Sequence, residues 1–308
     1  MFNSIVFFSE SNIRGKVPRD FENARTEFGW SIMLDADWCP IGQQPNSDIY
    51  DLGIVIIPKN NPNVDMGHVR KYCNKVAVMQ EGPHWYFQDY PVDKQIHYIN
   101  CLREADWVYC HNKSDVDYYL GLDCKDVRVM RSMMIPERLE SSGYSKDKSG
   151  ILLGGNFVSW YGGMDSYLVA SEINEKKYGV SMGRKQDQED AIDDIEYLPY
   201  LSWRDWIKHI GKYKVGVHMM RTHAAGTFSM NMSYHGTPVI GYYGLDTQEL
   251  LHPQTTVEIG DLRSAKFILE KLYENEDFYK ECSEESLHLF QKHYSEEAWI
   301  KDWEIKNG

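Results

Sequence analysis

The stretch from Lys214 to Tyr243, KVGVHMMRTHAAGTFSMNMSYHGTPVIGYY, decides the fold that this sequence predicts. Val215, Val217 and Met219 alternate with Gly216, His218 and Met220, which makes a short β-strand plausible. A polar loop that contains Gly226 follows, and a helix is expected from about Phe228 to His235. Gly236 to Ile240, GTPVI, turns back into a second apolar strand. The order strand, loop, helix and strand predicts a parallel sheet of the α/β class.

The loop before this helix is expected to bind phosphate. Backbone N–H groups near Gly226, Thr227 and Phe228 have no partner within the helix, and they lie beyond the carboxyl end of the first strand. Such donors, together with the positive end of the helix dipole, suit a diphosphate. Arg221 is close enough in sequence to add a positive charge and to act in catalysis by stabilising a phosphate leaving group.

This segment resembles the nucleotide-sugar site of GT-B fold glycosyltransferases, most closely the retaining family 4. A strand in that family precedes a pattern like P-S-R-x-E-x-x-G-x-x-x-x-E-A-x-x-x-G-T-P-V-I. Arg221, Gly226 and Gly236 to Ile240 fall in register with it, whereas its two glutamates fall on His223 and Asn231. The resemblance implies that His223 and Asn231 contact the donor, here through neutral groups that both donate and accept hydrogen bonds.

The fold implied by this resemblance is α/β, with two Rossmann-like domains whose parallel sheets face each other across a cleft. The implied activity is transfer of a sugar from a nucleotide-diphosphate donor, with retention at the anomeric carbon. An ordinary buried turn and strand of another α/β protein is the alternative, because G-T-P-V-I suits many parallel sheets.

Composition sets the outer limits on function. The chain has 308 residues, 42% apolar, which is enough for two domains with substantial cores. Its net charge of −13 provides no general attraction for nucleic acid or anionic lipid. The six cysteines form no C-x-x-C pair, and we find neither a signal peptide nor a long apolar segment, so we expect a reduced, cytoplasmic compartment and no membrane span.

Apolar runs separated by room for helices predict the sheet of the amino-terminal half. Phe21, Ala24, Phe28 and Ile32 recur at helical spacing and predict an amphipathic helix over that sheet. The expected strands are Ser4 to Phe8, Asp51 to Ile57, Lys75 to Met79 and Asp106 to Cys110, followed in the second half by Ile151 to Gly155 and Tyr178 to Met182.

A polar stretch from Pro136 to Gly150 is expected to form an exposed linker between two domains. The first domain is then an acceptor domain at 1–136, and the second is a nucleotide-sugar domain at 150–294. The resemblance also implies that a final helix, at 295–308, packs back on the first domain.

The amino-terminal half offers two further groups of candidate residues. Glu81 and His84 directly follow the strand that ends at Met79, and open α/β sheets bind ligands at the carboxyl ends of their strands. We therefore expect both residues to act in catalysis by orienting the acceptor or supporting the departing phosphate. The alternative is a plain Gly-Pro turn. The loop after the first strand contains three candidates for contact with the acceptor, which are Asn12, Arg14 and Gly15.

In the carboxyl-terminal half, the loop after Leu153 contributes Gly155 and Asn156 as donor-binding candidates. Asn156 stands where the family usually has arginine. Arg184, after the next expected strand, is a candidate for the diphosphate or an ordinary solvated residue.

Asp35 and Asp37 resemble the metal-binding D-x-D of the GT-A class, in which two carboxylates hold a divalent cation against the donor diphosphate. The motif comes too early for that class, since only one strand and one helix precede it. We interpret both aspartates as structural and expect no metal and no cofactor other than the nucleotide sugar, which is a co-substrate.

Three functions remain open at this stage. The first is a glycosyltransferase acting on a glycan, a small molecule or a lipid-linked acceptor. The second is a transferase acting on modified bases in DNA, because Asn23 to Trp30 and Gln80 to Tyr90 resemble small bacteriophage glycosyltransferases. The third is a nucleotide-binding protein without transferase activity.

Overall fold

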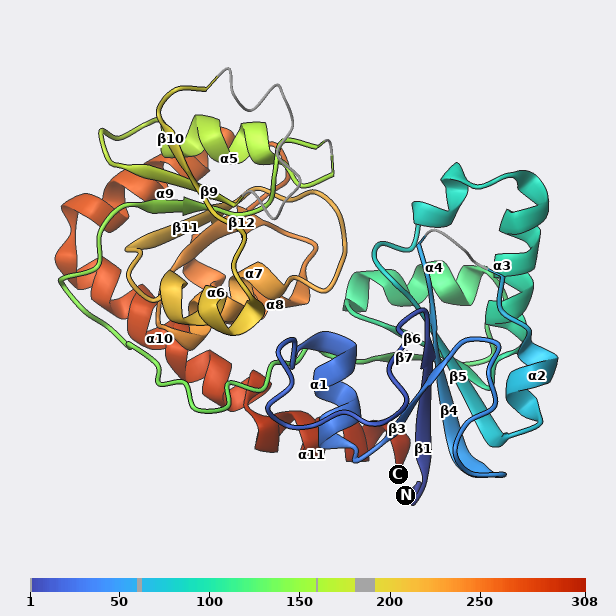
Figure 1. The fold of residues 1–308 in the computed structure, drawn as a ribbon. Helices are drawn as coiled ribbons and strands as arrows, with labels where there is room; N and C mark the ends of the chain where they lie inside the picture. Colours follow the sequence, from blue (N-terminus) through green and yellow to red (C-terminus); the bar gives the residue numbers. More distant parts are fainter. Residues whose placement is uncertain (1, 60–62, 159, 181–191) are drawn as a thin grey trace. The chain divides into compact units, whose positions relative to one another are not determined.

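Strands and helices alternate along most of the chain in the computed structural model, which describes residues 2–59, 63–158, 160–180 and 192–308 (Figure 1). The chain divides into two compact units. Unit 1 comprises Met1–Ile135, His223–Ala225 and Glu296–Gly308, and unit 2 comprises Pro136–Thr222 and Gly226–Ser295. Each unit contains its own parallel sheet, which confirms the predicted α/β class with two parallel-sheet units.

The described residues of unit 1 form a seven-stranded sheet in the order β2-β3-β1-β4-β5-β6-β7. All neighbouring pairs are parallel except β2 with β3 at one edge. Val6, Phe7 and Phe8 of β1 are completely buried, because the sheet is covered on both faces. The strands are β1 (Ile5–Ser9), β2 (Gly15–Lys16), β3 (Asp37–Pro40), β4 (Tyr50–Ile57), β5 (Cys73–Gln80), β6 (Trp107–Cys110) and β7 (Val127–Val129).

The helices of unit 1 come from both ends of the sequence. The last of them is anchored by Trp299, whose Nε1 donates to the carbonyl oxygen of Arg131 at 2.9 Å, and by the buried ring of Trp303. These helices are α1 (Thr26–Met33), α2 (Met66–Arg70), α3 (Val92–Glu104), α4 (Val116–Gly121) and α11 (Glu296–Asn307).

In unit 2 the described residues form a six-stranded parallel sheet in the order β10-β9-β8-β11-β12-β13. Its strands are β8 (Ile151–Leu153), β9 (Lys177–Val180), β10 (Ile195–Leu198), β11 (Val215–His218), β12 (Val239–Tyr242) and β13 (Thr256–Val257). Its helices are α5 (Gly163–Ala170), α6 (Trp203–Ile210), α7 (Thr227–Tyr234), α8 (Asp246–Leu251), α9 (Leu262–Glu274) and α10 (Glu276–Tyr294).

One local prediction was wrong, and a second holds only in part. The helix expected to begin near Phe21 begins at Thr26, because Arg25 is extended and forms a bridge with Met134. The stretch expected to be an exposed linker, 136–150, contains no helix or strand, but it belongs to unit 2 and is exposed only in part. Its Lys148 is buried and donates to the carbonyl oxygen of His235 and, at 3.1 Å, to Oγ1 of Thr237.

The strand expected from Tyr178 to Met182 ends at Val180 in the described part of the chain, and residues 181 and 182 lie outside it. Among the helices formed by the described ranges, none has the length and apolar character needed to cross a bilayer.

Candidate functional site

The candidate catalytic residues of unit 1 lie where two neighbouring strands end. Strands β5 and β6 are parallel partners, so the residues that follow them reach the same edge of the sheet. His84 follows β5 after a turn at Gly82, whose φ of +87° suits glycine. Asp115 follows β6 and lies just before α4.

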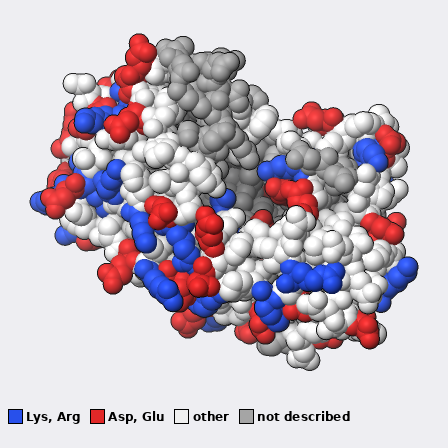
Figure 2. All heavy atoms as spheres, viewed as in Figure 1, with Lys and Arg blue, Asp and Glu red and all other residues white. Residues whose placement is uncertain are grey.

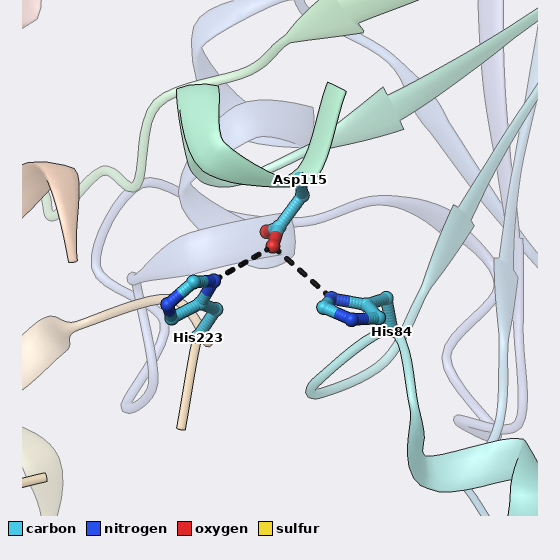
Figure 3. A group of neighbouring side chains, drawn as sticks. All are labelled: His84, Asp115 and His223. Carbon is cyan, nitrogen blue, oxygen red and sulfur yellow. Dashed lines mark hydrogen bonds and ion pairs between the residues drawn. The ribbon is translucent and has the colours of Figure 1, made fainter. Parts of the chain in front are cut away.

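Asp115 holds two imidazole rings (Figure 3). Its Oδ1 lies 3.1 Å from Nδ1 of His84 and also 3.1 Å from Nδ1 of His223, which comes from the loop between β11 and α7. The Asp115 side chain is only 6% exposed, while those of His84 and His223 are 20% and 26% exposed. A buried carboxylate therefore orients two rings that keep access to solvent.

Burial by itself would raise the pKa of Asp115, but hydrogen bonds from His223, His84 and Asn112 outweigh it and hold this pKa well below the usual range. Asp115 is therefore ionised at neutral pH, and an ionised carboxylate only accepts hydrogen bonds. Both histidines must donate from Nδ1, which leaves the lone pair of each Nε2 to accept a proton or a hydrogen bond. Sequence reasoning overlooked Asp115, although its position after β6 was the same signal that pointed to His84.

Polar side chains of unit 1 hold the segment His223–Ala225 in place. Asn112 Nδ2 donates to Oδ2 of Asp115 at 3.2 Å and to the carbonyl oxygen of Ala224 at 3.0 Å. Ser132 Oγ donates to the carbonyl oxygen of Ala225, and Ser114 Oγ lies 3.0 Å from Nδ1 of His223. These bonds fix the position of the tripeptide within unit 1.

The same three side chains are the group, among the described residues, with the spacing of a metal site. One ligand atom each of His84, Asp115 and His223 lies within 4.8 Å of the other two. Both Nδ1 atoms nevertheless bond to a single oxygen of Asp115, which satisfies the cluster as a hydrogen-bonded group. We therefore interpret it as an aspartate that orients two histidines.

A small cavity adjoins this cluster. Two polar atoms in its lining have no hydrogen-bond partner in the described part of the chain, namely Oε1 of Gln80 and Nδ1 of His111. Burial lowers the pKa of His111 to about 4, so this ring is neutral. The lining residues are Met79, Gln80, Gly82, His84, Tyr109, Cys110, His111, Asp115, Tyr119, His223 and Ala224.

Glu81, the other expected catalytic residue of unit 1, is ion-paired rather than joined to the His84 cluster. Its Oε1 lies 3.6 Å from Nζ of Lys59, which follows β4. Glu27 of α1 also lies near this pair: burial raises the pKa of its carboxyl group, and the charge of Glu81 adds to that effect. Sequence reasoning gave no reason to select Glu27, because it looked like a solvent-facing residue of an amphipathic helix.

The three acceptor-loop candidates follow β1, as expected from the sequence. Asn12 is exposed, and Gly15 has φ +81° in the short edge strand β2. Arg14 donates to Oε1 of Gln43 at 3.1 Å and to the carbonyl oxygen of Gln44 at 2.9 Å. Its guanidinium group therefore braces the loop after β3.

In unit 2 two helices begin at neighbouring strand ends. Helix α5 follows β8, α7 follows β11, and these strands are parallel partners. Each helix begins after a left-handed glycine, Gly162 with φ +65° and Gly226 with φ +62°, and neither glycine supplies a side-chain cap. A Cβ at Gly162 would lie 1.9 Å from the carbonyl oxygen of Met219, so the start of α5 is pressed against the end of β11. Two positive helix ends thus converge at one edge of the sheet, an arrangement suited to a diphosphate.

Arg221 is already paired with a carboxylate at this edge. Its Nη2 lies 2.6 Å from Oδ2 of Asp165 in the first turn of α5, and the hydroxyl of Tyr242 donates to the same oxygen at 3.0 Å. The Arg221 side chain is still 55% exposed. A phosphate could therefore share this guanidinium with Asp165.

The remaining donor candidates are distributed around the same strand ends. Thr227 and Phe228 form the first turn of α7, and Asn231 is buried further along that helix with its Oδ1 unpartnered among the described residues. Asn156 is buried, and its Oδ1 accepts from the backbone N–H of Val158 at 3.3 Å. Gly155 has φ +74° in the same loop. Arg184 lies outside the described residues.

Asp35 and Asp37 do not lie at the carboxyl ends of the parallel strands of unit 1. Asp37 opens β3, which is parallel to β1, so it lies at the opposite edge of the sheet from His84. Both aspartates face Nζ of Lys16, at 3.3 Å and 3.6 Å, and Asp37 also accepts from the Tyr50 hydroxyl at 2.6 Å. These contacts agree with a structural role.

No known family profile matches this sequence, and no curated protein is significantly similar to it. Solved structures are nevertheless similar along the whole chain. Sucrose-phosphate synthase from Thermosynechococcus elongatus matches with TM-score 0.71 and 12% identity over 98% of this chain and 97% of its own.

HepE from Anabaena, in complex with UDP-glucose, matches with TM-score 0.69 and 10% identity over 99% of each chain. An α-glucosyltransferase in complex with UDP and a 13-mer DNA containing an HMU base matches with TM-score 0.61 and 11% identity, over 100% of this chain and 99% of its own. At these identities the likeness concerns the fold, and the protein thus has the GT-B fold of these glycosyltransferases.

Proposed function

We propose that this protein is a glycosyltransferase that moves a sugar from a UDP-sugar donor to an acceptor hydroxyl group. The observation that carries the proposal is the full-length likeness to glycosyltransferases, two of which were solved with UDP or UDP-glucose. The two uncapped helix starts of unit 2 and the oriented histidines of unit 1 are the features such a reaction needs. We accordingly assign donor binding to unit 2 and acceptor binding to unit 1.

On the donor side, the bond between the anomeric carbon and the β-phosphate oxygen breaks, and its electron pair leaves with the phosphate. The N–H groups of Thr227 and Phe228 lie at the start of α7, where they can donate to the growing negative charge. Arg221 adds a positive charge that it shares with Asp165. We propose that these groups stabilise the leaving group without a metal.

On the acceptor side, Nε2 of His84 accepts a hydrogen bond from the acceptor hydroxyl group, because Asp115 engages its Nδ1–H. We propose transfer with retention, in which the new bond forms on the face that the phosphate leaves. The acceptor proton then goes to the departing phosphate oxygen.

Release of UDP from a panel of UDP-sugars, with and without excess chelator, tests this proposal. We expect one or more UDP-sugars to raise the melting temperature and to be turned over in chelator, with the product anomer read by NMR. Binding without turnover would favour the non-catalytic alternative. Strict Mn²⁺ dependence that is lost in Asp37→Ala would contradict the proposed mechanism.

DNA with modified bases is the second acceptor class to consider. Its support is the full-length likeness to an α-glucosyltransferase solved with DNA containing an HMU base. Basic and acidic side chains are interspersed on the face shown in Figure 2, and the net charge is −13, so charge alone does not favour DNA. This acceptor class is tested by incubating hydroxymethylated and unmodified DNA with UDP-sugars and analysing the nucleosides by mass spectrometry. If DNA is the acceptor, a hexose or pentose should be added to the modified base only.

A further inference from the structure

His218, the last residue of β11, is a buried histidine without a hydrogen bond. It is 5% exposed, and neither ring nitrogen has a partner in the described part of the chain. Buried polar side chains in proteins are nearly always paired, because an unpaired group loses its bonds to water and gains nothing in return. An unpaired imidazole therefore calls for an explanation at this position.

The ring lies between the loop after β8 and the first turn of α7. A Cβ at Gly154 would come within 2.7–2.9 Å of its ring atoms, and its centroid is 5.0 Å from that of Phe228. Only glycine at position 154 leaves room for this ring. Gly154 and Gly155 also form the turn beside it, and two consecutive glycines can change conformation at little steric cost.

Other unpaired polar atoms surround the start of the same helix. Thr247 Oγ1 has no partner among the described residues. It lies close to Gly226, the residue before α7: a Cβ added to Gly226 would be 1.9 Å from it. Asn231 Oδ1, also unpaired, is in the third position after Phe228. Unsatisfied groups thus gather near the start of α7, one of the two helix starts that we assign to the diphosphate.

Another histidine of unit 2 provides a comparison. His252 is as buried as His218, and burial lowers the pKa of each to about 4, so both rings are neutral. His252 is fully paired: its Nδ1 accepts from the Val239 backbone N–H at 3.3 Å, and its Nε2 lies 3.1 Å from the carbonyl oxygen of Ser229. The fold therefore pairs a buried histidine where the ring is structural and leaves His218 unpaired.

We propose that His218 is a binding residue for the donor diphosphate, whose oxygens accept its ring N–H beside the amides of the first turn of α7. This inference rests on the proposed function, because it assumes that a nucleotide diphosphate binds at this edge. A neutral imidazole suits the position because it offers one N–H without a buried charge. The turn at Gly154 and Gly155 shifts to admit the phosphate.

Calorimetric titration of His218→Phe with UDP tests this role. We expect UDP affinity to fall by roughly 10-fold to 100-fold, the usual effect of one hydrogen bond to a charged group. The melting temperature of the free protein should stay the same or rise, because the substitution removes an unpaired polar group. His218→Gln, which keeps a donor, should retain more affinity than His218→Phe.

His252→Asn is the matched control. It should lower the melting temperature and leave UDP affinity within about twofold, since His252 is assigned to the fold alone. If wild-type protein binds no UDP at all, the proposed function and this inference both fail. If wild type and His218→Phe bind UDP equally well, only the inference is overturned.

A measurement on the wild type covers the case in which His218→Phe does not fold. Histidine ring ¹⁵N resonances, assigned with His218→Gln, should show a shift for His218 when UDP is added and little change for His252. An unshifted His218 resonance at saturating UDP would overturn the proposal.

Discussion

His223 lies with its Nδ1 3.1 Å from Oδ1 of Asp115, although 108 positions separate the two residues in the sequence. The contact makes His223 part of unit 1, while Gly226, three residues later, belongs to unit 2. Asp115 therefore binds a residue whose own chain runs directly into the proposed phosphate loop.

Asp115→Asn should lower turnover by about tenfold or more, because an amide side chain holds two imidazole rings less strongly than a carboxylate does. UDP affinity should change much less, since the start of α7 retains its N–H groups. The ratio of kcat to KM, together with UDP titration, separates the two effects. Asp117→Asn, on the exposed side of α4, is the control and should behave like wild type.

His84→Ala should lower turnover and leave UDP affinity nearly unchanged, because His84 is in unit 1 and the donor is assigned to unit 2. Glu81→Gln should have a smaller effect, since the Glu81 carboxylate is paired with Lys59 rather than with the His84 cluster. Initial rates at saturating UDP-sugar check both. An equal loss of UDP binding in His84→Ala would place the donor site in unit 1.

Arg221→Ala should weaken binding of UDP by about 1.5 to 3 kcal/mol, the usual value of a hydrogen bond between charged groups. Asp165→Asn should leave the affinity unchanged or increase it, because Arg221 no longer shares its charge with a carboxylate. Titration of both variants with UDP distinguishes these outcomes. Equal losses in the two variants would show that Asp165 is needed to position Arg221.

Gly226→Ala should destabilise unit 2 and impair UDP binding, since φ is +62° and the new Cβ would lie 1.9 Å from Oγ1 of Thr247. Gly162→Ala should cost at least as much, because its Cβ would meet the carbonyl oxygen of Met219, a backbone atom that cannot rotate away. Adding Thr247→Ala should restore part of the stability of Gly226→Ala and none of that of Gly162→Ala. Urea denaturation of the two single and the two double variants measures these differences.

Stability should fall as the pH drops below about 6.5. Burial lowers the pKa of His218, His235 and His252 to about 4, whereas unfolded histidine titrates near 6.5. The unfolded chain therefore binds protons first, and each residue's contribution is fully present above pH 6.5 and decreases until the folded form titrates near pH 4. Between pH 7.5 and 5 each histidine contributes at most about 2 kcal/mol to this loss. Denaturation curves at both pH values should show a smaller difference for His218→Phe than for wild type.

Local sequence patterns were sufficient for much of the fold. The runs that became β4 and β5 are long, apolar and β-branched, so their positions could be read within two residues. Strands such as β3, with the sequence DWCP, and β13, with two residues, were not predicted. They are too short and too mixed in composition to show a period, and they form because they pair with neighbouring strands.

The candidate site was predicted only in part. His84 was found from its position directly after a strand, whereas Asp115 was not, although both follow neighbouring strands. His223 was selected by register with a family pattern that implied contact with the donor, and the structure places its ring against Asp115. Local periodicity cannot indicate a contact between residues 108 positions apart. It also cannot predict that Lys148, in a polar segment, is buried.

Unit 1 is assembled from three separate parts of the chain: Met1–Ile135, the tripeptide His223–Ala225 and the last segment, Glu296–Gly308. No single continuous fragment of the chain therefore contains the whole of unit 1 and nothing else. A fragment that ends at Ile135 lacks α11, whose Trp299 and Trp303 are buried, and it also lacks the imidazole that binds Asp115. Expression of this unit alone calls for a fusion that attaches residues 296–308 through a designed connection, with His223 supplied as a separate peptide.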